Sequence, residues 1–466
     1  MEGQILKVSL IQPNTSNRYP QHCLGLGKIA GMLEFHCHEV QIVDADALNL
    51  SVEQVVQIIK SFQPDYVGIS VRTPSLGISV KTAEKIKEAM PTVPLIIGGP
   101  HVTAFSKETL ERFSCFDIGV LHEGEYTMLD VVNGCPYSKI LGLVYRESNE
   151  ILTTEKRPLI KNLDDLPFTA YHLMPLDHYK PYPPNLKLPF IGYISSRGCP
   201  GVCLFCYHGL FGYEYRCNSA EYVVREIENC IQKFGIKSVI FYDDTFSLNR
   251  QRVVDICNLL LERKLKIQFR CETRVNLVDE ELLRLMKKAG LVHVSFGVES
   301  GNQEIINEWK KGITIDQVRR AFRLSDKVGI ETILAYMIIG APSETEKSIK
   351  ESINLMKELN PDLVQWSVAC PLPSTELARW YESEFGKIEN VSSLMYSNIY
   401  SSKDWKPVYR SKNFTSEELM FWVRKAYREF YLRPEYFFRR FKKTKNLRML
   451  KMNVAGLKDL LGVSAS

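Results

Sequence analysis

The sequence predicts an α/β protein with three parts: a doubly wound parallel sheet, then a partial, TIM-like barrel of six β/α units, then a helical C-terminal region. Two observations predict this class. Short β-branched segments alternate with amphipathic helical patterns over residues 5–121, and the alternation resumes at residue 190. Between these stretches, residues 157–189 contain seven prolines and few periodic signals, which is typical of a linker.

The N-terminal part contains five expected strands, at 5–12, 39–43, 65–71, 93–98 and 117–121. Helices are expected between them at 24–36, 52–59, 78–90 and 107–113. Ser51 and Gln54 form a capping box at the start of the second helix. Ligands of such sheets bind beyond the carboxyl ends of the strands.

The middle part contains six expected strands, at 190–195, 237–242, 266–271, 292–298, 332–339 and 363–369. Helical patterns fill the gaps, for example Ala220–Phe234, which Gly235 ends. Six strands rather than eight predict an open barrel, whose active residues should lie at the carboxyl ends of the strands. The expected divisions are 1–145, a hairpin and linker at 146–189, the barrel at 190–375, and a basic, aromatic helical region at 376–466.

Composition narrows the class of protein. A net charge of +5 over 466 residues is mild and predicts no nucleic-acid partner. No run approaches 18 apolar residues, and the first residues do not resemble a signal peptide. The twelve cysteines are scattered without a disulfide spacing, so we expect a reducing, cytoplasmic location.

Positive charge gathers near the end of the chain. Residues 424–451 hold eleven Lys or Arg against two Glu, with aromatic residues between them. Such a helix can lie on a membrane surface or meet an anionic partner. Alternatively, it packs its aromatic side chains on its own domain and solvates its charges.

The most informative stretch carries Cys199, Cys203 and Cys206, at a C-x3-C-x2-C spacing directly after an expected strand. Three thiolates on one tight loop can hold three corners of an iron–sulfur cluster and leave the fourth iron open. Structural zinc is the alternative, with His208 as a fourth ligand, but no second cysteine pair follows.

This run resembles the signature of the radical S-adenosylmethionine enzymes. The first 145 residues are similar to the cobalamin-binding domain that precedes the barrel in many of them, although the pattern alone also suits a generic nucleotide-binding domain. The resemblance covers about residues 1–375 and points to the class B methyltransferases and the anaerobic magnesium-protoporphyrin ester cyclase. It implies three cofactors: a [4Fe–4S] cluster, S-adenosylmethionine and cobalamin.

The resemblance also implies contacts with S-adenosylmethionine at the ends of the barrel strands. Asp243 and Asp244 stand where many relatives have Gly-Gly-Glu, so a carboxylate there should accept hydrogen bonds from the amine. Arg274 could pair with the carboxylate of the ligand. The expected set is Phe205, Tyr207, Asp243, Asp244, Arg274, Glu299, Ser300 and Ile339.

Cobalamin contacts are implied at four strand ends of the first sheet. They are Asn14, Thr15, Ser70, Arg72, Thr73, Gly98, Gly99, His101, Glu123, Gly124 and Glu125. The chain lacks the Asp-x-His-x-x-Gly motif that supplies an axial histidine in other cobalamin proteins. His101 has a second interpretation, as an ordinary hydrogen-bonding loop residue.

The function implied by the resemblance is methylation of an unactivated carbon on a small-molecule, natural-product or lipid-like substrate. A flavodoxin or ferredoxin would supply electrons, and the basic end of the chain could contact a membrane. Two alternatives are a cyclase or rearrangement enzyme that transfers no methyl group, and a non-catalytic cobalamin sensor or carrier. The sequence assigns no catalytic residue.

Overall fold

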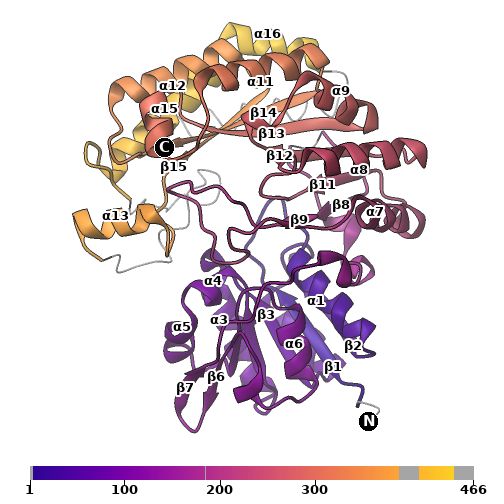
Figure 1. Ribbon diagram of the computed structural model, residues 1–466. Helices are drawn as coiled ribbons and strands as arrows, with labels where there is room; N and C mark the ends of the chain where they lie inside the picture. The colour runs from indigo at the N-terminus through magenta and orange to yellow at the C-terminus, as the bar shows by residue number, and fades with distance from the viewer. Residues whose placement is uncertain (1–3, 184, 388–408, 445–466) are drawn as a thin grey trace. The chain divides into compact units, whose positions relative to one another are not determined.

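The computed structural model describes residues 4–183, 185–387 and 409–444. The chain forms two compact units, each with its own sheet (Figure 1). The first unit comprises Met1–Lys180, Arg197–Cys199 and Tyr207–Asn218, and the second comprises Pro181–Ser196, Pro200–Cys206 and Ser219–Ser466. Among the described residues, no helix is long and apolar enough to cross a membrane.

The first unit is built on a seven-stranded sheet of order β2-β1-β3-β4-β5-β6-β7. Its parallel strands are β1 (Lys7–Gln12), β2 (Glu39–Asp44), β3 (Tyr66–Ser70), β4 (Leu95–Gly98) and β5 (Ile118–Val120). All five were expected from the sequence. The order 2-1-3-4-5 is that of a doubly wound sheet with its switch point between β1 and β3, where ligands of this architecture bind.

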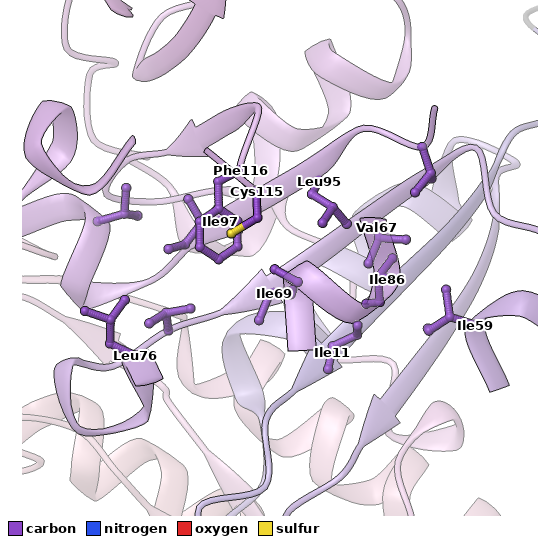
Figure 2. Packing of buried hydrophobic residues seen from close by; sticks show 14 of the residues in the cluster. Ile11, Ile59, Val67, Ile69, Leu76, Ile86, Leu95, Ile97, Cys115 and Phe116 are labelled. Atoms are coloured by element: carbon purple, nitrogen blue, oxygen red, sulfur yellow. The ribbon is translucent and has the colours of Figure 1, made fainter. Parts of the chain in front are cut away.

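Helices cover both faces of this sheet. They are α1 (Leu24–Phe35), α2 (Val52–Phe62), α3 (Leu76–Ala89), α4 (Pro100–Ala104), α5 (Ser106–Arg112) and α6 (Glu125–Val132). The capping box at α2 is confirmed, because Ser51 Oγ accepts from Gln54 N and the Gln54 side chain accepts from Ser51 N. Figure 2 shows the core on the α2–α3 face, where Ile11, Ile69 and Ile97 of the sheet lie among helix residues such as Ile86.

The expected hairpin forms, as β6 (Leu143–Glu147) and β7 (Glu150–Thr153). It extends the first sheet, since β6 pairs antiparallel with β5, whereas the sequence grouped the hairpin with the linker that follows it. The reason lies in burial. Leu143, Val144 and Tyr145 are each at most 2% exposed, so both faces of β6 need cover that a surface hairpin would lack.

The following proline-rich segment packs closely on α1 through short 3-10 turns at Leu163–Asp165, Tyr171–Leu173 and Leu176–His178. A Cβ on Gly31 would stand 2.4 Å from the carbonyl oxygen of Phe168, so only glycine permits this approach. Tyr179 donates to Asp44 Oδ2 at 2.6 Å. The segment up to Lys180 is therefore a fixed part of the first unit.

The second unit contains a six-stranded, all-parallel sheet of order β15-β14-β13-β12-β11-β8. Its strands are β8 (Phe190–Tyr193), β11 (Ser238–Phe241), β12 (Gln268–Thr273), β13 (Leu291–Glu299), β14 (Thr332–Ile339) and β15 (Leu363–Val368). All six match expected strands. Because β8 and β15 are edges that do not pair with each other, the barrel is open, as six strands predicted.

Helices lie between and after these strands. They are α7 (Ala220–Phe234), α8 (Arg250–Glu262), α9 (Glu280–Ala289), α10 (Gln303–Glu308), α11 (Ile315–Val328), α12 (Glu346–Leu359), α13 (Glu376–Phe385), α15 (Ser416–Tyr431) and α16 (Pro434–Lys443). Gly235 ends α7 in the left-handed conformation, as expected. A small two-stranded sheet joins β9 (Ser196–Arg197) to β10 (Arg216–Cys217).

The two faces of the barrel sheet can be assigned from one contact. Phe296 of β13 packs on Phe322 of α11, with ring centroids 5.3 Å apart, so the even positions of β13 face the helices. Ser295 and Gly297 therefore face the opposite, concave side. Parallel pairing places Glu272 beside Ser295 and Tyr336 beside Gly297, which puts both of these side chains on the concave face as well.

Helix α15 covers the edge strand β15. Tyr431 Oη accepts from Val364 N at 2.8 Å and donates to Val364 O at 2.9 Å, and Tyr427 Oη makes the same pair of bonds to Trp366 at 3.1 and 3.2 Å. Four helical residues rise about 6 Å and two strand residues about 6.6 Å, so the two spacings match. The tyrosine hydroxyls thus satisfy backbone groups that an open sheet leaves unpaired.

Among the described aromatic residues of the basic end, those of α15 largely pack on the domain. Tyr427, Phe430 and Tyr431 are buried, as the packing alternative expected. On α16, Phe438 and Phe441 remain 62% and 80% exposed.

We predict that Tyr427→Phe combined with Tyr431→Phe destabilises the second unit by about 2–4 kcal/mol, because each substitution leaves buried backbone groups without a partner. Thermal unfolding followed by circular dichroism measures the effect. Arg424→Ala, an exposed position on the same helix, is the control and should change stability by less than about 0.5 kcal/mol. Equal stability of the double variant and the control would contradict this role.

Candidate functional site

The cysteine loop carries thiols that solvent can reach. Cys206 is exposed, and Cys199 and Cys203 are half-buried, whereas Cys257 and Cys271 are fully buried in the core. Cys206 N donates to Cys203 O at 3.0 Å, which makes a tight turn between the last two. Accessible thiols with this spacing suit a cluster, which takes each thiolate at a different iron.

No described group of three or more His, Cys, Asp or Glu side chains is gathered around one point as a single metal ion requires. Two backbone bonds anchor the middle of the cysteine loop to the second unit. Leu204 N donates to Trp309 O at 3.0 Å, and Leu377 N donates to Leu204 O at 2.9 Å. The peptide between Cys203 and Cys206 is thereby held at fixed points of the barrel.

The start of the loop is held by Asp243, which follows β11 and is 1% exposed. Its Oδ1 accepts from Ser195 N at 2.6 Å and from Ser196 N at 3.1 Å, and its Oδ2 accepts from Ser195 Oγ at 2.6 Å. Arg252 of α8 donates to Ser195 O at 2.8 Å and to Ser195 Oγ at 2.7 Å. These bonds use the carboxylate of Asp243 to fix the chain just before the cysteines, while neighbouring Asp244 is exposed.

Arg274, after β12, contacts the loop directly. Its Nη1 lies 3.8 Å from Cys203 Sγ, and its Nη2 donates to the carbonyl oxygen of Lys311. Lys311 in turn pairs with Glu299 Oε1 at 2.7 Å and lies 5.9 Å from the ring of Phe205. Arg274 therefore contacts Cys203, and Lys311 links Arg274 to Glu299 and lies near the ring of Phe205.

Glu299 adopts a positive φ of 71°, which is unusual for a residue with a side chain. Gly297 makes room for it, because a Cβ on Gly297 would stand 2.5 Å from Glu299 Oε1 and 2.6 Å from Lys311 Nζ. Such strain is kept only where the surrounding structure imposes it. The carboxylate is thus aimed by its backbone and fixed by a buried lysine.

Two other expected ligand contacts are buried within the protein. Ser300 is fully buried and its Oγ lies 3.1 Å from Ser352 Oγ. Ile339 is 1% exposed, on the helix-facing side of β14, and the accessible neighbour on the concave face is Ile338. These residues can shape the site through the backbone, which the sequence could not distinguish from side-chain contact.

The turn after β14 is shaped by a buried carboxyl group. Glu344 Oε2 accepts from Gly340 N at 2.8 Å and from Ala341 N at 3.1 Å. Burial raises the pKa of Glu344 to about 7, although these two hydrogen bonds act in the opposite direction. The turn after β14 is thereby held by a side chain from within the protein.

The concave face carries further polar side chains, among which sequence reasoning did not select Tyr336, Gln365 and Ser367. Tyr336 donates to Glu272 Oε1 at 2.8 Å, and Arg270 Nη2 lies 3.3 Å from the same oxygen. Gln365 and Ser367 of β15 are half-buried on the same face, by register with β14. The sequence did contain a pattern that could have indicated these residues, because their positions alternate with apolar residues along each strand.

In the first unit, the end of β1 is held by hydrogen bonds. Asn14 Nδ2 donates to Leu50 O at 3.0 Å, and Thr15 N donates to Asp46 Oδ1 at 2.7 Å. A cavity of about 260 Å³ opens beside Asn14, between the ends of the strands and helices α2 and α3. Its lining comes from the end of β1, the segment after β2, and helices α2 and α3.

The ends of β3 and β4 form a second part of this edge. Gly99 has a φ of 101°, and a Cβ there would stand 2.9 Å from Val71 O. His101 Nδ1 lies 3.0 Å from Thr73 Oγ1, and burial lowers the pKa of His101 to about 4, so its ring is neutral at physiological pH. Thr73 is thus a hydrogen-bond partner of His101, which supports the interpretation of His101 as a hydrogen-bonding loop residue.

The remaining expected contacts on this edge differ in exposure. Arg72 is exposed, and Ser70 and Gly98 are half-buried at the ends of their strands. Gly124 lies in a tight place, because its Cβ would stand 3.2 Å from side-chain atoms of Ile29 and Val120. An edge of small and accessible groups suits the close approach of a large, flat ligand.

Glu123 and Glu125 are the exception on this edge, because both carboxylates are buried and paired with arginines. Glu123 binds Arg197 and Arg216, and Glu125 binds Arg197. Burial favours a neutral carboxyl, but the charge of Arg197 outweighs it and lowers the pKa of Glu125. Tyr207, the last residue of the expected ligand set, packs its ring against Gly209 in the same unit.

We predict that Asp243→Asn and Asp244→Asn separate two roles. Asp243→Asn removes the charge that holds Ser195 and Ser196, so it should lower iron bound per chain by about tenfold. Asp244→Asn should leave iron content unchanged and raise the dissociation constant for S-adenosylmethionine by about tenfold, the loss of a charge-assisted bond. Iron analysis and equilibrium dialysis measure the two effects, and each variant is the control for the other. Identical behaviour of both variants would contradict the division.

Comparison with known proteins agrees with this geometry. Residues 15–132 match the model of the B12 binding domain, and residues 193–356 match that of the Radical SAM superfamily. Over 443 residues the chain is 35% identical to the uncharacterized methyltransferase PH0819 of Pyrococcus horikoshii, covering 93% of this chain and 94% of that one. It is 28% identical to the anaerobic magnesium-protoporphyrin IX monomethyl ester cyclase of Cereibacter sphaeroides, covering 89% of this chain and 66% of that one.

Solved structures share the fold. The radical S-adenosylmethionine methyltransferase TsrM from Kitasatospora setae superposes with a TM-score of 0.69 at 18% identity, covering 82% of this chain and 75% of that one. The cobalamin-dependent enzyme OxsB superposes with a TM-score of 0.76 at 17% identity, covering 98% and 71%. The chain belongs to the cobalamin-binding radical S-adenosylmethionine enzymes, with a [4Fe–4S] cluster, S-adenosylmethionine and cobalamin as its cofactors.

Proposed function

We propose that this enzyme methylates an unactivated carbon of a polar small molecule. The observation that carries the proposal is the accessible concave face of the barrel sheet. Glu272 of β12 and Tyr336 of β14 lie on this face, and Arg274 follows β12. When bound, the cluster and S-adenosylmethionine supply the radical that activates a carbon–hydrogen bond, and cobalamin supplies the methyl group. Kinship with a relative named as a methyltransferase supports the same reaction.

We assign the cofactor contacts as follows. The thiolates of Cys199, Cys203 and Cys206 hold the cluster. Asp244, exposed beside the fixed Asp243, accepts from the amine of S-adenosylmethionine, and Arg274 binds its carboxylate. Glu299 binds a hydroxyl of the ribose. The expected cobalamin contacts at the ends of β1, β3 and β4 are retained.

The substrate is recognised through hydrogen bonds. Burial raises the pKa of Tyr336, so its hydroxyl keeps its proton and donates to Glu272. One oxygen of Glu272 is shared by Tyr336 and Arg270, which leaves the carboxylate able to accept a donor from a ligand. Gln365 and Ser367 add further polar groups. An amine or hydroxyl on the substrate suits this face better than a lipid chain.

The expected partners are an electron donor for the cluster and a membrane surface. We propose a flavodoxin or ferredoxin as the electron donor, tested by optical reduction of the cluster, and a cytoplasmic location. Contact of α16 with a membrane is supported by exposed Phe438 and Phe441, and co-sedimentation of the full chain with anionic liposomes tests it.

Oxidative cyclisation without methyl transfer is the second candidate. The cyclase of Cereibacter sphaeroides supports it, because its 28% identity extends over 425 residues. The two reactions differ in the mass of the product. Methylation adds one carbon and two hydrogens, whereas cyclisation by oxidation removes hydrogen and adds no carbon from S-adenosylmethionine.

We predict that the reconstituted, reduced enzyme transfers deuterium-labelled methyl from S-adenosylmethionine to a component of a small-molecule extract of its source organism. Mass spectrometry of the extract, with and without enzyme, detects the labelled product. Cys203→Ala is the control and should give none, since it removes a cluster ligand. A product that lacks the label and has lost hydrogen would contradict methylation and support the cyclase.

We predict that Glu272→Gln and Tyr336→Phe lower formation of the labelled product by about tenfold or more, because each removes a polar contact made to the substrate. Cleavage of S-adenosylmethionine to deoxyadenosine and iron per chain should stay at the parent level. Liquid chromatography of both products from one reaction measures the ratio. Parallel loss of cleavage and methylation would place these residues in the cofactor site instead.

A further inference from the structure

Two arginines stand at the base of the cysteine loop. Arg197 precedes Cys199 by two residues, and Arg216 follows Cys206 by ten. They lie on β9 and β10, which pair with each other in the two-stranded sheet. The segment that carries all three cysteines therefore begins and ends at this pair.

Both arginines bind the end of β5 in the first unit. Glu123 Oε1 accepts from Arg197 Nη1 at 2.7 Å and from Arg216 Nη1 at 2.9 Å. Glu125 Oε1 accepts from Arg197 Nη2 at 2.5 Å. The four side chains are at most 7% exposed, and their charges balance.

The remaining bonds of this group also stay within the first unit. Glu123 Oε2 accepts from Ile160 N at 2.8 Å, so both oxygens of this carboxylate are used. Arg216 donates to Ile160 O at 2.7 Å and to Phe211 O at 3.0 Å, and Phe211 belongs to the cysteine segment. His122 adds a contact at 2.8 Å to Gly209 O in the same segment.

We propose that Glu123, Glu125, Arg197 and Arg216 are positioning residues for the iron–sulfur loop, and that the two glutamates are not cobalamin contacts. Buried ion pairs add little net stability, but they can specify one arrangement of the chain. Here they fix both ends of the cysteine segment to the residues that follow β5, the last parallel strand of the cobalamin-binding sheet. The proposal rests on the cluster assignment and is independent of methyl transfer.

Two substitutions in the full chain test this role. Arg216→Lys keeps the charge but loses the planar group that reaches Glu123, Ile160 and Phe211 together. Glu125→Gln keeps the shape and removes one charge. Asp130→Asn is the matched control, since it breaks an ion pair with Arg157 elsewhere in the same unit. Each protein is reconstituted with iron, sulfide and hydroxocobalamin and checked by circular dichroism.

Three quantities are measured: cobalamin per chain from optical spectra, iron per chain, and the electron paramagnetic resonance spectrum of the reduced cluster with and without S-adenosylmethionine. We expect about tenfold lower iron retention, or an altered cluster spectrum, in both test variants, with cobalamin per chain as in the parent and the control.

Loss of cobalamin with an unchanged cluster spectrum would overturn the proposal and assign the glutamates to cobalamin. A lower melting temperature with an unchanged spectrum would reduce the group to a structural role. If Glu125→Gln does not fold, Arg216→Lys alone decides between these outcomes. None of the three measurements depends on methyl transfer, so they test this proposal even if the enzyme does not methylate its substrate.

Discussion

The buried carboxylate of Asp243 holds the chain just before the three cysteines. It gathers two backbone amides and a hydroxyl from Ser195 and Ser196, the residues that lead into the cysteine loop. A carboxylate removed from water needs this number of donors, and Arg252 supplies the opposing charge. The loop therefore starts from a point fixed on two strands of the barrel, and the exposed Asp244 beside it takes a defined position.

A second constraint is the parallel sheet itself. Parallel strands bring their carboxyl ends to one edge, which is why Arg274 after β12 and Glu299 at the end of β13 are linked there through Lys311. The strain at Glu299 and the missing side chain of Gly297 are local adaptations to that crowding.

Much of the fold was predictable from local pattern, and the site was less so. The capping box of Ser51 and the end of α7 at Gly235 depend on neighbouring residues, and both agree with the sequence. Contacts between residues that are far apart in the sequence could not be predicted in this way. Asp243 meets Ser195 across 48 residues and Glu123 meets Arg216 across 93, so a motif could mark these residues as important but could not separate ligand contact from internal pairing. The pairing of the hairpin β6–β7 with the first sheet was not predicted for the same reason, because the burial of both faces of β6 depends on residues far away in the sequence.

The tyrosines of α15 have a consequence for how the enzyme behaves among other proteins. An open barrel exposes the backbone of its last strand, which is the usual template for joining the sheet of a second chain. Tyr427 and Tyr431 occupy those backbone groups from a helix, which offers no free edge of its own. The barrel can thus remain open for a substrate without exposing an edge strand that would promote aggregation.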